Sequence, residues 1–339
     1  MTVTLSDVAR EAGVSLATAS RAINGSASRT VGSELRDRVL AAALRLRYTP
    51  DANAQAMARG RTTSLGLLVH DIADPYFSTI AAGVAQAADA AGLQMTLASS
   101  QHDPAREVDL VHLLRRQRAR AIIVSGGRTD DVAINDQLRL ALADYRATGG
   151  AAALIGQPIL GVNTVVVNHA QGATQLARAM HDRGYRRFAI LGGPEGHLSA
   201  RERREAFAFA LRERGADLPD DATVFGEFTH AGGEEGMRTL MARGPLPELV
   251  FAVADVIALG AMAAMRDAGI RVPQDVAVAG FSDIPTLRDV TPALTTVRIP
   301  LRELGVMATE LALAEPAEEP EIRRVLTEVV IRDTTPHLR

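Results

Sequence analysis

Hydrophobic positions near the start of the chain recur at helical spacing. The apolar side chains lie three or four residues apart and are Leu5, Val8, Ala9, Ala12, Ala19 and Ile23. Residues with this spacing share one face of a helix, so the pattern predicts two short amphipathic helices. Gly13 falls where the first helix must end, because glycine adopts the left-handed conformation without strain.

Polar residues mark where these helices begin. Thr4 is a predicted N-cap with Asp7 three positions further on, and Ser15 is a predicted cap of the second helix. A third helix follows from a predicted cap at Ser33, with an apolar face of Leu35, Val39, Ala42 and Leu46. Two short helices joined by a tight turn form a helix-turn-helix, whose second helix docks in the major groove of DNA.

From Ser64 onward the pattern changes to short, continuous apolar runs that alternate with helical stretches. The runs are 65–69, 93–97, 121–124, 152–155, 165–167, 188–191, 249–253 and 276–279. Such runs are typical of strands buried on both faces, and helices between them indicate parallel βαβ units. A segment of roughly 270 residues is too long to fold around a single sheet of ordinary size, so we expect two similar doubly wound α/β lobes.

Composition narrows the function classes. The chain has 339 residues, of which 47% are hydrophobic and 23% charged, and it contains no cysteine. Disulfides, thiolate metal sites and cysteine nucleophiles are therefore excluded. We see no signal peptide, no apolar stretch long enough to span a membrane, no phosphate-loop spacing, no Gly-x-Ser-x-Gly elbow and no metal spacing among the histidines. We expect no enzyme activity, no cofactor and no metal.

Charge is distributed unevenly along the chain. Residues 1–61 hold nine arginines and five acidic residues, a net charge of +4, whereas the whole chain carries −3, which leaves −7 for the remainder. A basic N-terminal segment and an acidic remainder suit a protein whose N-terminal segment binds the phosphates of DNA and whose remainder does not.

The first residues closely resemble the start of the lac repressor and gal repressor family of bacterial transcription regulators. The matching residues are Thr4-Leu5, Asp7-Val8-Ala9, Ala12-Gly13-Val14-Ser15, Thr18 and Ser20-Arg21. Landmarks of the same family continue along the body, at Asp74–Phe77, Arg203–Phe207, Asp255 with Ala258–Met262, Gly280–Asp283 and Pro292–Val297. The resemblance implies a periplasmic-binding-protein-like core: two lobes, several chain crossings and a ligand cleft between the lobes.

We divide the chain into a helix-turn-helix domain (1–48), a hinge helix (49–61) and a two-lobed effector-binding and dimerisation domain (62–339). In the hinge, Thr49 suits a cap, Pro50 the first helical position and Gly60 the stop. The helix between them is short and alanine-rich, so it is marginal in water alone. The resemblance implies that it pairs with its dimer mate and wedges an apolar side chain, here Met57, into the minor groove.

On the second helix, Leu16, Ala17 and Arg21 are left free on the outer face, where we expect Arg21 to read a guanine edge. The full set of predicted DNA contacts is Thr4, Ser15, Leu16, Ala17, Thr18, Ser20, Arg21, Asn24, Tyr48, Asn53 and Met57.

The resemblance also implies the residues of the cleft. Tyr76 and Phe77 match positions that pack against the effector, Arg203 matches an arginine that grips hydroxyls or carboxylates, and Phe228 matches a ring that stacks on the ligand. Arg201 is the second-choice arginine. The full set of predicted effector contacts is Asp74, Tyr76, Phe77, Ser125, Arg203, Phe228, Asp255 and Asp283.

The chain departs from the family pattern at three polar positions. Gly156, Ala254 and Ser282 stand where sugar-binding members often have a carboxylate, an asparagine and an aspartate. Buried sugar hydroxyls need partners, so these departures weaken a sugar effector without displacing it as the leading class.

These observations predict a homodimeric, sequence-specific DNA-binding regulator, most simply a repressor, switched by a small molecule, with a sugar or sugar derivative favoured. The alternatives are a cytoplasmic small-molecule binding protein without a DNA role and an enzyme on the same type of sheet. The expected partners are a pseudo-palindromic operator, the effector and a second copy of the chain, with no membrane. We expect a cytoplasmic location, a closing strand over 325–331 and dimerisation through the α/β body.

Overall fold

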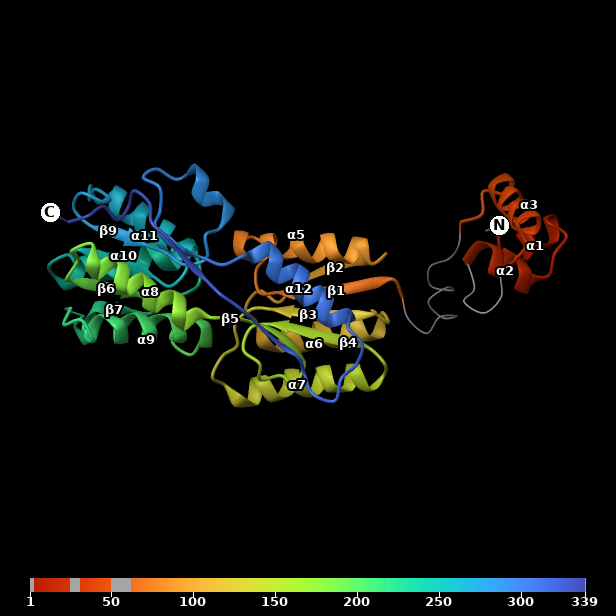
Figure 1. Ribbon diagram of the computed structural model, residues 1–339, viewed down its shortest axis with the longest axis horizontal. Coiled ribbons are helices and arrows are strands. Elements are labelled where there is room, and N and C mark those ends of the chain that lie inside the picture. Colours follow the sequence, from red (N-terminus) through yellow and green to blue (C-terminus); the bar gives the residue numbers. More distant parts are fainter. Residues whose placement is uncertain (1–2, 25–30, 50–61, 217, 339) are drawn as a thin grey trace. The chain divides into compact units, whose positions relative to one another are not determined.

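The computed structural model describes residues 3–24, 31–49, 62–216 and 218–338 (Figure 1). The chain divides into two compact units, Met1–Thr62 and Thr63–Arg339. The predicted hinge, including Asn53 and Met57, lies almost entirely outside the described residues.

The first unit contains the three predicted helices: α1 (Leu5–Glu11), α2 (Leu16–Asn24) and α3 (Ser33–Arg45). Thr4 donates to Asp7 Oδ2 from its hydroxyl at 2.7 Å and from its backbone N–H at 3.0 Å, which confirms the cap. The Ser15 hydroxyl accepts from the backbone N–H of Thr18 at 3.1 Å. The predicted cap at Ser33 is wrong, because the carbonyl of Gly32 accepts the first helical bond and Ser33 is already helical.

The small core of this unit lies between the three helices. Its buried side chains are Val8, Ala9, Ala12, Ala19, Ala22, Val39 and Ala42. Alanine and valine dominate, so the helices approach closely and the larger apolar side chains are left at the edge. Leu16 is 52% exposed, and Leu35, which we placed on the buried face, is 37% exposed.

The second unit consists of two lobes. The sheet of the N-terminal lobe is parallel, in the order β11-β5-β4-β3-β1-β2. Its strands are β1 (Ser64–Val69), β2 (Gln94–Ser99), β3 (Ala121–Ser125), β4 (Ala151–Ile155), β5 (Asn163–Val167) and β11 (Ile322–Val325). In Figure 1, α5 (Pro75–Ala90) and α12 (Leu301–Leu313) cover one face, and α6 (Pro104–Arg116) and α7 (Val132–Ala147) cover the other.

The C-terminal lobe has a smaller parallel sheet in the order β7-β6-β8-β9. Its strands are β6 (Phe188–Leu191), β7 (Thr223–Val224), β8 (Leu249–Ala252) and β9 (Ala277–Ala279). Its helices are α8 (His169–Asp182), α9 (Leu198–Arg212), α10 (His230–Arg243) and α11 (Asp255–Asp267), with 3-10 turns at Asp220–Ala222 and Pro285–Asp289. All eight apolar runs form strands of these two sheets, which confirms the predicted fold class.

The chain crosses between the lobes three times, after β5, after β10 (Thr296–Arg298) and after β11. The single closing strand predicted over 325–331 is therefore wrong. β11 ends at Val325 in the N-terminal sheet, and β12 (Glu328–Val330) pairs antiparallel with β10. Leu326 and Thr327 make the crossing, so one apolar run serves both lobes.

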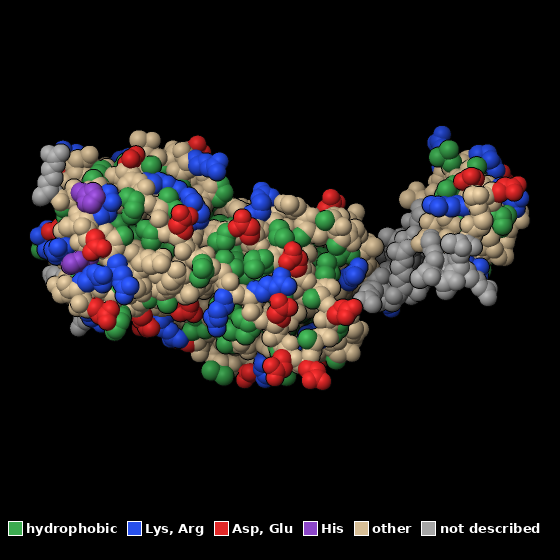
Figure 2. All heavy atoms as spheres, in the orientation of Figure 1, with side chains coloured by type: hydrophobic (Ala, Val, Ile, Leu, Met, Phe, Trp, Pro, Cys, Tyr) green, Lys and Arg blue, Asp and Glu red, His purple; other side chains and the backbone are tan. Residues whose placement is uncertain are grey.

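On the face of the body that Figure 2 shows, charged side chains are dispersed. Figure 2 shows blue arginine and red acidic side chains interspersed with hydrophobic ones over the face of the body that is turned to the viewer. On that face the excess of acidic residues is not gathered into one broad area.

Helices α10 and α11 approach each other through glycine. A Cβ added to Gly260 would overlap the carbonyl oxygen of His230, and a Cβ added to Gly233 would overlap that of Ile257. Backbone atoms cannot move aside as a flexible side chain can, so this contact tolerates no larger residue.

We therefore expect Gly260→Ala to lower the free energy of unfolding by about 1–3 kcal/mol, the usual cost of overpacking. Gly226→Ala is the control, because its Cβ would meet only the carbonyl of Gly232 at 3.5 Å. Urea unfolding followed by circular dichroism measures both. Equal midpoints for the two variants would contradict this packing.

Candidate functional site

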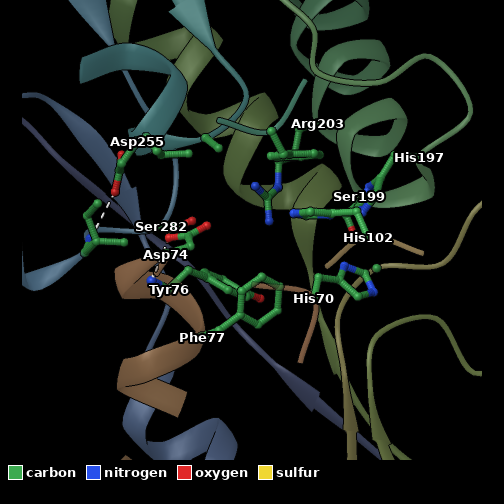
Figure 3. Close-up of a pocket in the computed structure, with 15 residues that line it drawn as sticks. His70, Asp74, Tyr76, Phe77, His102, His197, Ser199, Arg203, Asp255 and Ser282 are labelled. Atoms are coloured by element: carbon green, nitrogen blue, oxygen red, sulfur yellow. Dashed lines mark hydrogen bonds between the residues drawn. The ribbon is translucent and has the colours of Figure 1, made fainter. Parts of the chain in front are cut away.

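A pocket lies between the two lobes, beyond the carboxyl ends of strands from both sheets (Figure 3). The space between its lining atoms is about 550 Å³, open solvent included. Its lining residues are His70, Asp74, Tyr76, Phe77, His102, Gly127, His197, Ser199, Arg203, Phe228, Ala254, Asp255, Val256, Ser282 and Ile284. Six of the eight predicted effector residues are among them.

The start of α5 forms the wall that the N-terminal lobe contributes. Asp74 caps this helix by accepting from the backbone N–H of Tyr76 at 2.9 Å, and Pro75 occupies the first helical position. Tyr76 and Phe77 meet edge to face, with ring centroids 5.0 Å apart. Burial raises the pKa of Asp74, while the charge of Arg203 acts the other way.

Arg203, from α9 of the C-terminal lobe, extends into the centre of the pocket (Figure 3). Its side chain is almost completely buried, Nε donates to His169 Nδ1 at 3.2 Å, and Nη1 donates to the carbonyl of Val253 at 2.7 Å. Its guanidinium carbon lies 4.2 Å from the centroid of the Phe281 ring. Among the described residues, no carboxylate lies within ion-pair distance of Arg203, and burial lowers its pKa.

Asp255, the first residue of α11, is 1% exposed. Its carboxylate accepts from the hydroxyl of Thr296 at 2.6 Å and from the backbone N–H of Ile284 at 3.0 Å. Burial raises its pKa to about 6. Asp255 thus joins a pocket-lining helix to β10, next to a crossing between the lobes.

Three histidines stand around the pocket. The ring centroid of His70 lies 5.4 Å from that of His102 and 6.4 Å from that of His197, and the ring of Phe228 lies 4.8 Å from His197. Burial lowers the pKa of His70 well below its usual value and that of His197 to about 3. Both imidazoles are therefore neutral at pH 7.

Sequence reasoning missed a buried ion pair behind these histidines. Arg128 donates to both carboxylate oxygens of Glu107, at 2.7 and 3.0 Å, and its Nη2 lies 3.0 Å from His70 Nε2. Gln157 accepts from the backbone N–H of Arg128 at 2.8 Å and donates to Ser199 in the other lobe at 3.0 Å. Glycines directly before Arg128 were a signal of a special loop, but nothing local in the sequence indicates Glu107 as its partner.

The loop that carries Arg128 also forms backbone hydrogen bonds with the C-terminal lobe. The backbone N–H of Asp130 donates to the carbonyl of Gly196 at 2.9 Å, and that of Leu198 donates to the carbonyl of Arg128 at 2.8 Å. At the rim, Arg201 pairs with Asp130 at 3.0 Å. Arg201, our second-choice arginine, thus bonds across the cleft without lining the pocket.

Two predicted effector residues do not line the pocket. Ser125 is fully buried at the end of β3, and its hydroxyl has no hydrogen-bond partner in the described structure. Asp283 forms ion pairs with Arg298 at 2.8 Å and Arg332 at 2.6 Å. These bonds hold the strands beside a crossing, and the neighbouring Ser282 faces the pocket instead.

In the first unit, Leu16 and Ala17 are exposed at the start of α2 and Arg21 is half-buried. Ser15 and Thr18 are hydrogen-bonded through their hydroxyls at 2.8 Å, and Asn24 donates to Ser20 at 3.2 Å. Tyr48 packs half-buried against the core of this unit, and Thr4 is engaged with Asp7. On the outer side of α2, Leu16 and Ala17 are therefore more exposed than Arg21.

Comparisons with known proteins identify this combination. Residues 4–51 match the model of bacterial regulatory proteins of the lacI family, and residues 177–335 match a periplasmic binding protein-like domain. The chain is 34% identical to the transcriptional regulator GalS of Salmonella typhimurium, over 92% of its length and 89% of that relative's. The chain belongs to the lacI family of bacterial transcriptional regulators.

Other members are similar over nearly the whole chain. GalR of Escherichia coli is 33% identical over 97% of this chain and 94% of that relative. Among solved structures, a lac repressor dimer bound to operator and the anti-inducer ONPF has a TM-score of 0.83 at 25% identity, covering 99% of this chain and 100% of that one. A complex of the transcriptional regulator CelR with cellobiose has a TM-score of 0.71 at 28% identity, covering 98% and 99%.

Family membership makes the chain a DNA-binding transcriptional regulator and not an enzyme, and it removes the alternative of a binding protein without a DNA role. Within the described ranges, no helix has the length and apolar character needed to cross a membrane. In the part of the chain that the structure describes, no three His, Cys, Asp or Glu side chains are grouped so that they could hold a metal ion.

The depressed pKa of His197 predicts how stability depends on pH. The unfolded chain takes up a proton near pH 6.5 and the folded one near 3, so His197 opposes folding increasingly as pH falls below about 6.5. Asp74, Glu202 and Asp255 have raised pKa values and act in the opposite direction. Comparison with a variant that lacks the imidazole isolates the contribution of His197 to the pH dependence of stability.

Between pH 7 and pH 5, we expect the free energy of unfolding to fall by about 2 kcal/mol less in the His197→Asn variant than in the parent. Asparagine is chosen because it can still accept the helix-capping bond that Ala200 donates to His197. Urea unfolding at each pH measures the difference. Parallel stability curves for parent and variant would show that His197 is not buried in its neutral form.

Proposed function

We propose that the chain is a homodimeric repressor whose operator binding is switched by a sugar or sugar derivative in the pocket between the lobes. The observation that carries this proposal is the buried guanidinium of Arg203, which stacks on the ring of Phe281 and lines a pocket that the two lobes share. The relatives support the class of ligand, because they include a ribose operon repressor of Escherichia coli and the CelR–cellobiose complex.

For DNA, we propose that α2 enters the major groove of one half-site and that two copies of the chain read a pseudo-palindrome. We keep the division into a DNA-binding domain (1–48), a hinge helix (49–61) and an effector and dimerisation domain (62–339). The lac repressor structure, described as a dimer bound to operator, supports the pairing. We place the protein in the cytoplasm.

For the switch, we propose that the ligand changes how the lobes meet. Residues of both lobes line the pocket, and the backbone hydrogen bonds that join 128–130 to 196–198 lie beside it. A ligand that binds one lobe arrangement more tightly shifts the population toward that arrangement. Operator binding then changes to the extent that the two arrangements differ in their affinity for the operator.

Arg203→Ala should weaken effector binding about 10–100-fold, because a buried charged donor is lost, and should leave operator affinity nearly unchanged. Arg238→Ala is the matched control, since this arginine on α10 pairs with Glu234 of the same helix and lies outside the pocket. Fluorescence anisotropy of labelled upstream DNA, titrated with a sugar panel, reports both properties. Release of DNA from the Arg203 variant at unchanged ligand concentration would place the effector elsewhere.

Arg21→Ala should cost about 1–3 kcal/mol of operator binding and remove the preference at one base position in each half-site. Arg10→Ala, on α1, is the comparison, because its loss should leave the order of base preference intact. Binding to a library of single-base operator variants tests this. A uniform loss across all sequences would make Arg21 a phosphate contact.

A further inference from the structure

The hydrogen-bonding groups of the pocket are unevenly divided between donors and acceptors. Arg203 uses Nε and Nη1 within the protein, and no described residue accepts a hydrogen bond from its Nη2. The hydroxyl of Ser199 accepts from Gln157, so its own hydrogen is left to donate. The centre of the pocket therefore presents N–H and O–H groups.

The protein also fixes two imidazoles as donors. Arginine has no acceptor, so His70 Nε2 must accept from Arg128 Nη2, and the ring proton of the neutral imidazole lies on Nδ1. His197 Nδ1 accepts from the backbone N–H of Ala200 at 3.4 Å, which places its ring proton on Nε2. Neither of these ring N–H groups donates to a partner in the described part of the chain, and both rings line the pocket.

Each carboxylate of the pocket already accepts a hydrogen bond within the protein, Asp74 through one oxygen and Asp255 through both. Asp74 accepts from Tyr76, and Asp255 accepts from Thr296 and Ile284. Each also lies at the N-terminus of a long helix, α5 or α11, where the helix dipole offsets negative charge. Arg203 lies within α9. The charges of Asp74, Glu202 and Asp255 act on it, but none of these carboxylates is within ion-pair distance, so a direct anionic partner for its guanidinium is left to a ligand.

A neutral sugar fits this inventory poorly. Each hydroxyl both donates and accepts, and a buried hydroxyl whose hydrogen finds no acceptor loses about 1–3 kcal/mol. Among the nearby lining groups, Ala254 and Val256 are apolar. The acceptors there are the hydroxyls of Ser282 and Tyr76 and the second carboxylate oxygen of Asp74. A ligand group that only accepts hydrogen bonds matches the donors of Arg203, His197, His70 and Ser199.

We propose that the effector carries an anionic group, a carboxylate or a phosphate, which Arg203 and the ring N–H groups of His70 and His197 bind. The natural class is an acidic sugar derivative with its ring between Tyr76, Phe77 and Phe228. Arg128 acts as a positioning residue, because its bond to His70 sets which ring nitrogen carries the proton. This inference rests on the proposed function of the same pocket.

Matched ligand pairs test the proposal on the full chain. D-Galactose is compared with D-galacturonate and galactose 6-phosphate, and D-glucose with D-glucuronate and glucose 6-phosphate, by calorimetry and by release of labelled upstream DNA. We expect an acidic member to bind at least about tenfold more tightly than its neutral twin. The uronate and phosphate arms distinguish the two sources of the anion.

Variants separate charge recognition from folding. Arg203→Lys should reduce the acid-over-neutral preference, because it keeps a charge but loses the planar fork. His197→Ala should weaken the acidic ligand about 3–10-fold more than its neutral twin, since one donor to the anion is lost. Arg201→Lys, outside the pocket, should keep the full preference. A preference unchanged in both pocket variants would overturn the proposal.

The outcomes also separate this inference from the proposed function. If a neutral sugar binds as tightly as its acidic twin and releases DNA, the sugar-switched repressor stands and the anionic effector is refuted. If no compound of either kind binds, sugar sensing and the anionic effector both fail, while DNA binding is judged from the Arg21 variant alone.

Discussion

Arg128 and Glu107 form a doubly hydrogen-bonded ion pair that water hardly reaches, and the arrangement of the cleft depends on it. Breaking such a pair from one side leaves an uncompensated buried charge, typically at a cost of about 3–5 kcal/mol. The pair fixes the loop after β3, and that loop in turn orients His70, receives Gln157 and bonds the backbone of the other lobe. One buried contact thereby sets both the wall of the pocket and the seam between the lobes.

Asp255 has a comparable role on the opposite side. It joins the start of α11 to Thr296 on β10 and to Ile284 in the loop after β9. Asp283, two residues beyond Phe281, ties the same region to Arg298 and Arg332. The pocket is therefore bounded by polar bonds between segments distant in sequence, and a ligand that touches Asp255 or Arg203 acts on groups already coupled to the crossings.

Much of this fold is predictable from the sequence because its signals are local. Apolar runs between helical stretches give the two sheets, and Thr4 with Asp7 gives the first cap. Local signals fail where partners are distant. Glu107 and Arg128 are 21 residues apart on elements that look unremarkable alone, and Asp283 lies beside the pocket residue Ser282 but bonds elsewhere. The run 325–331 misled us because periodicity does not reveal a change of sheet.

The three crossings have a consequence for how the protein is made. The N-terminal sheet takes its edge strand, β11, from residues 322–325, and the helix that covers one face, α12, from residues 301–313. During synthesis β5 remains an open edge, and α5 lacks its neighbour, until residues 301–325 have left the ribosome. Sheet edges and uncovered apolar faces favour aggregation. The N-terminal lobe is thus completed only after the four strands of the C-terminal sheet have been made, and the nascent chain must be kept from self-association until then.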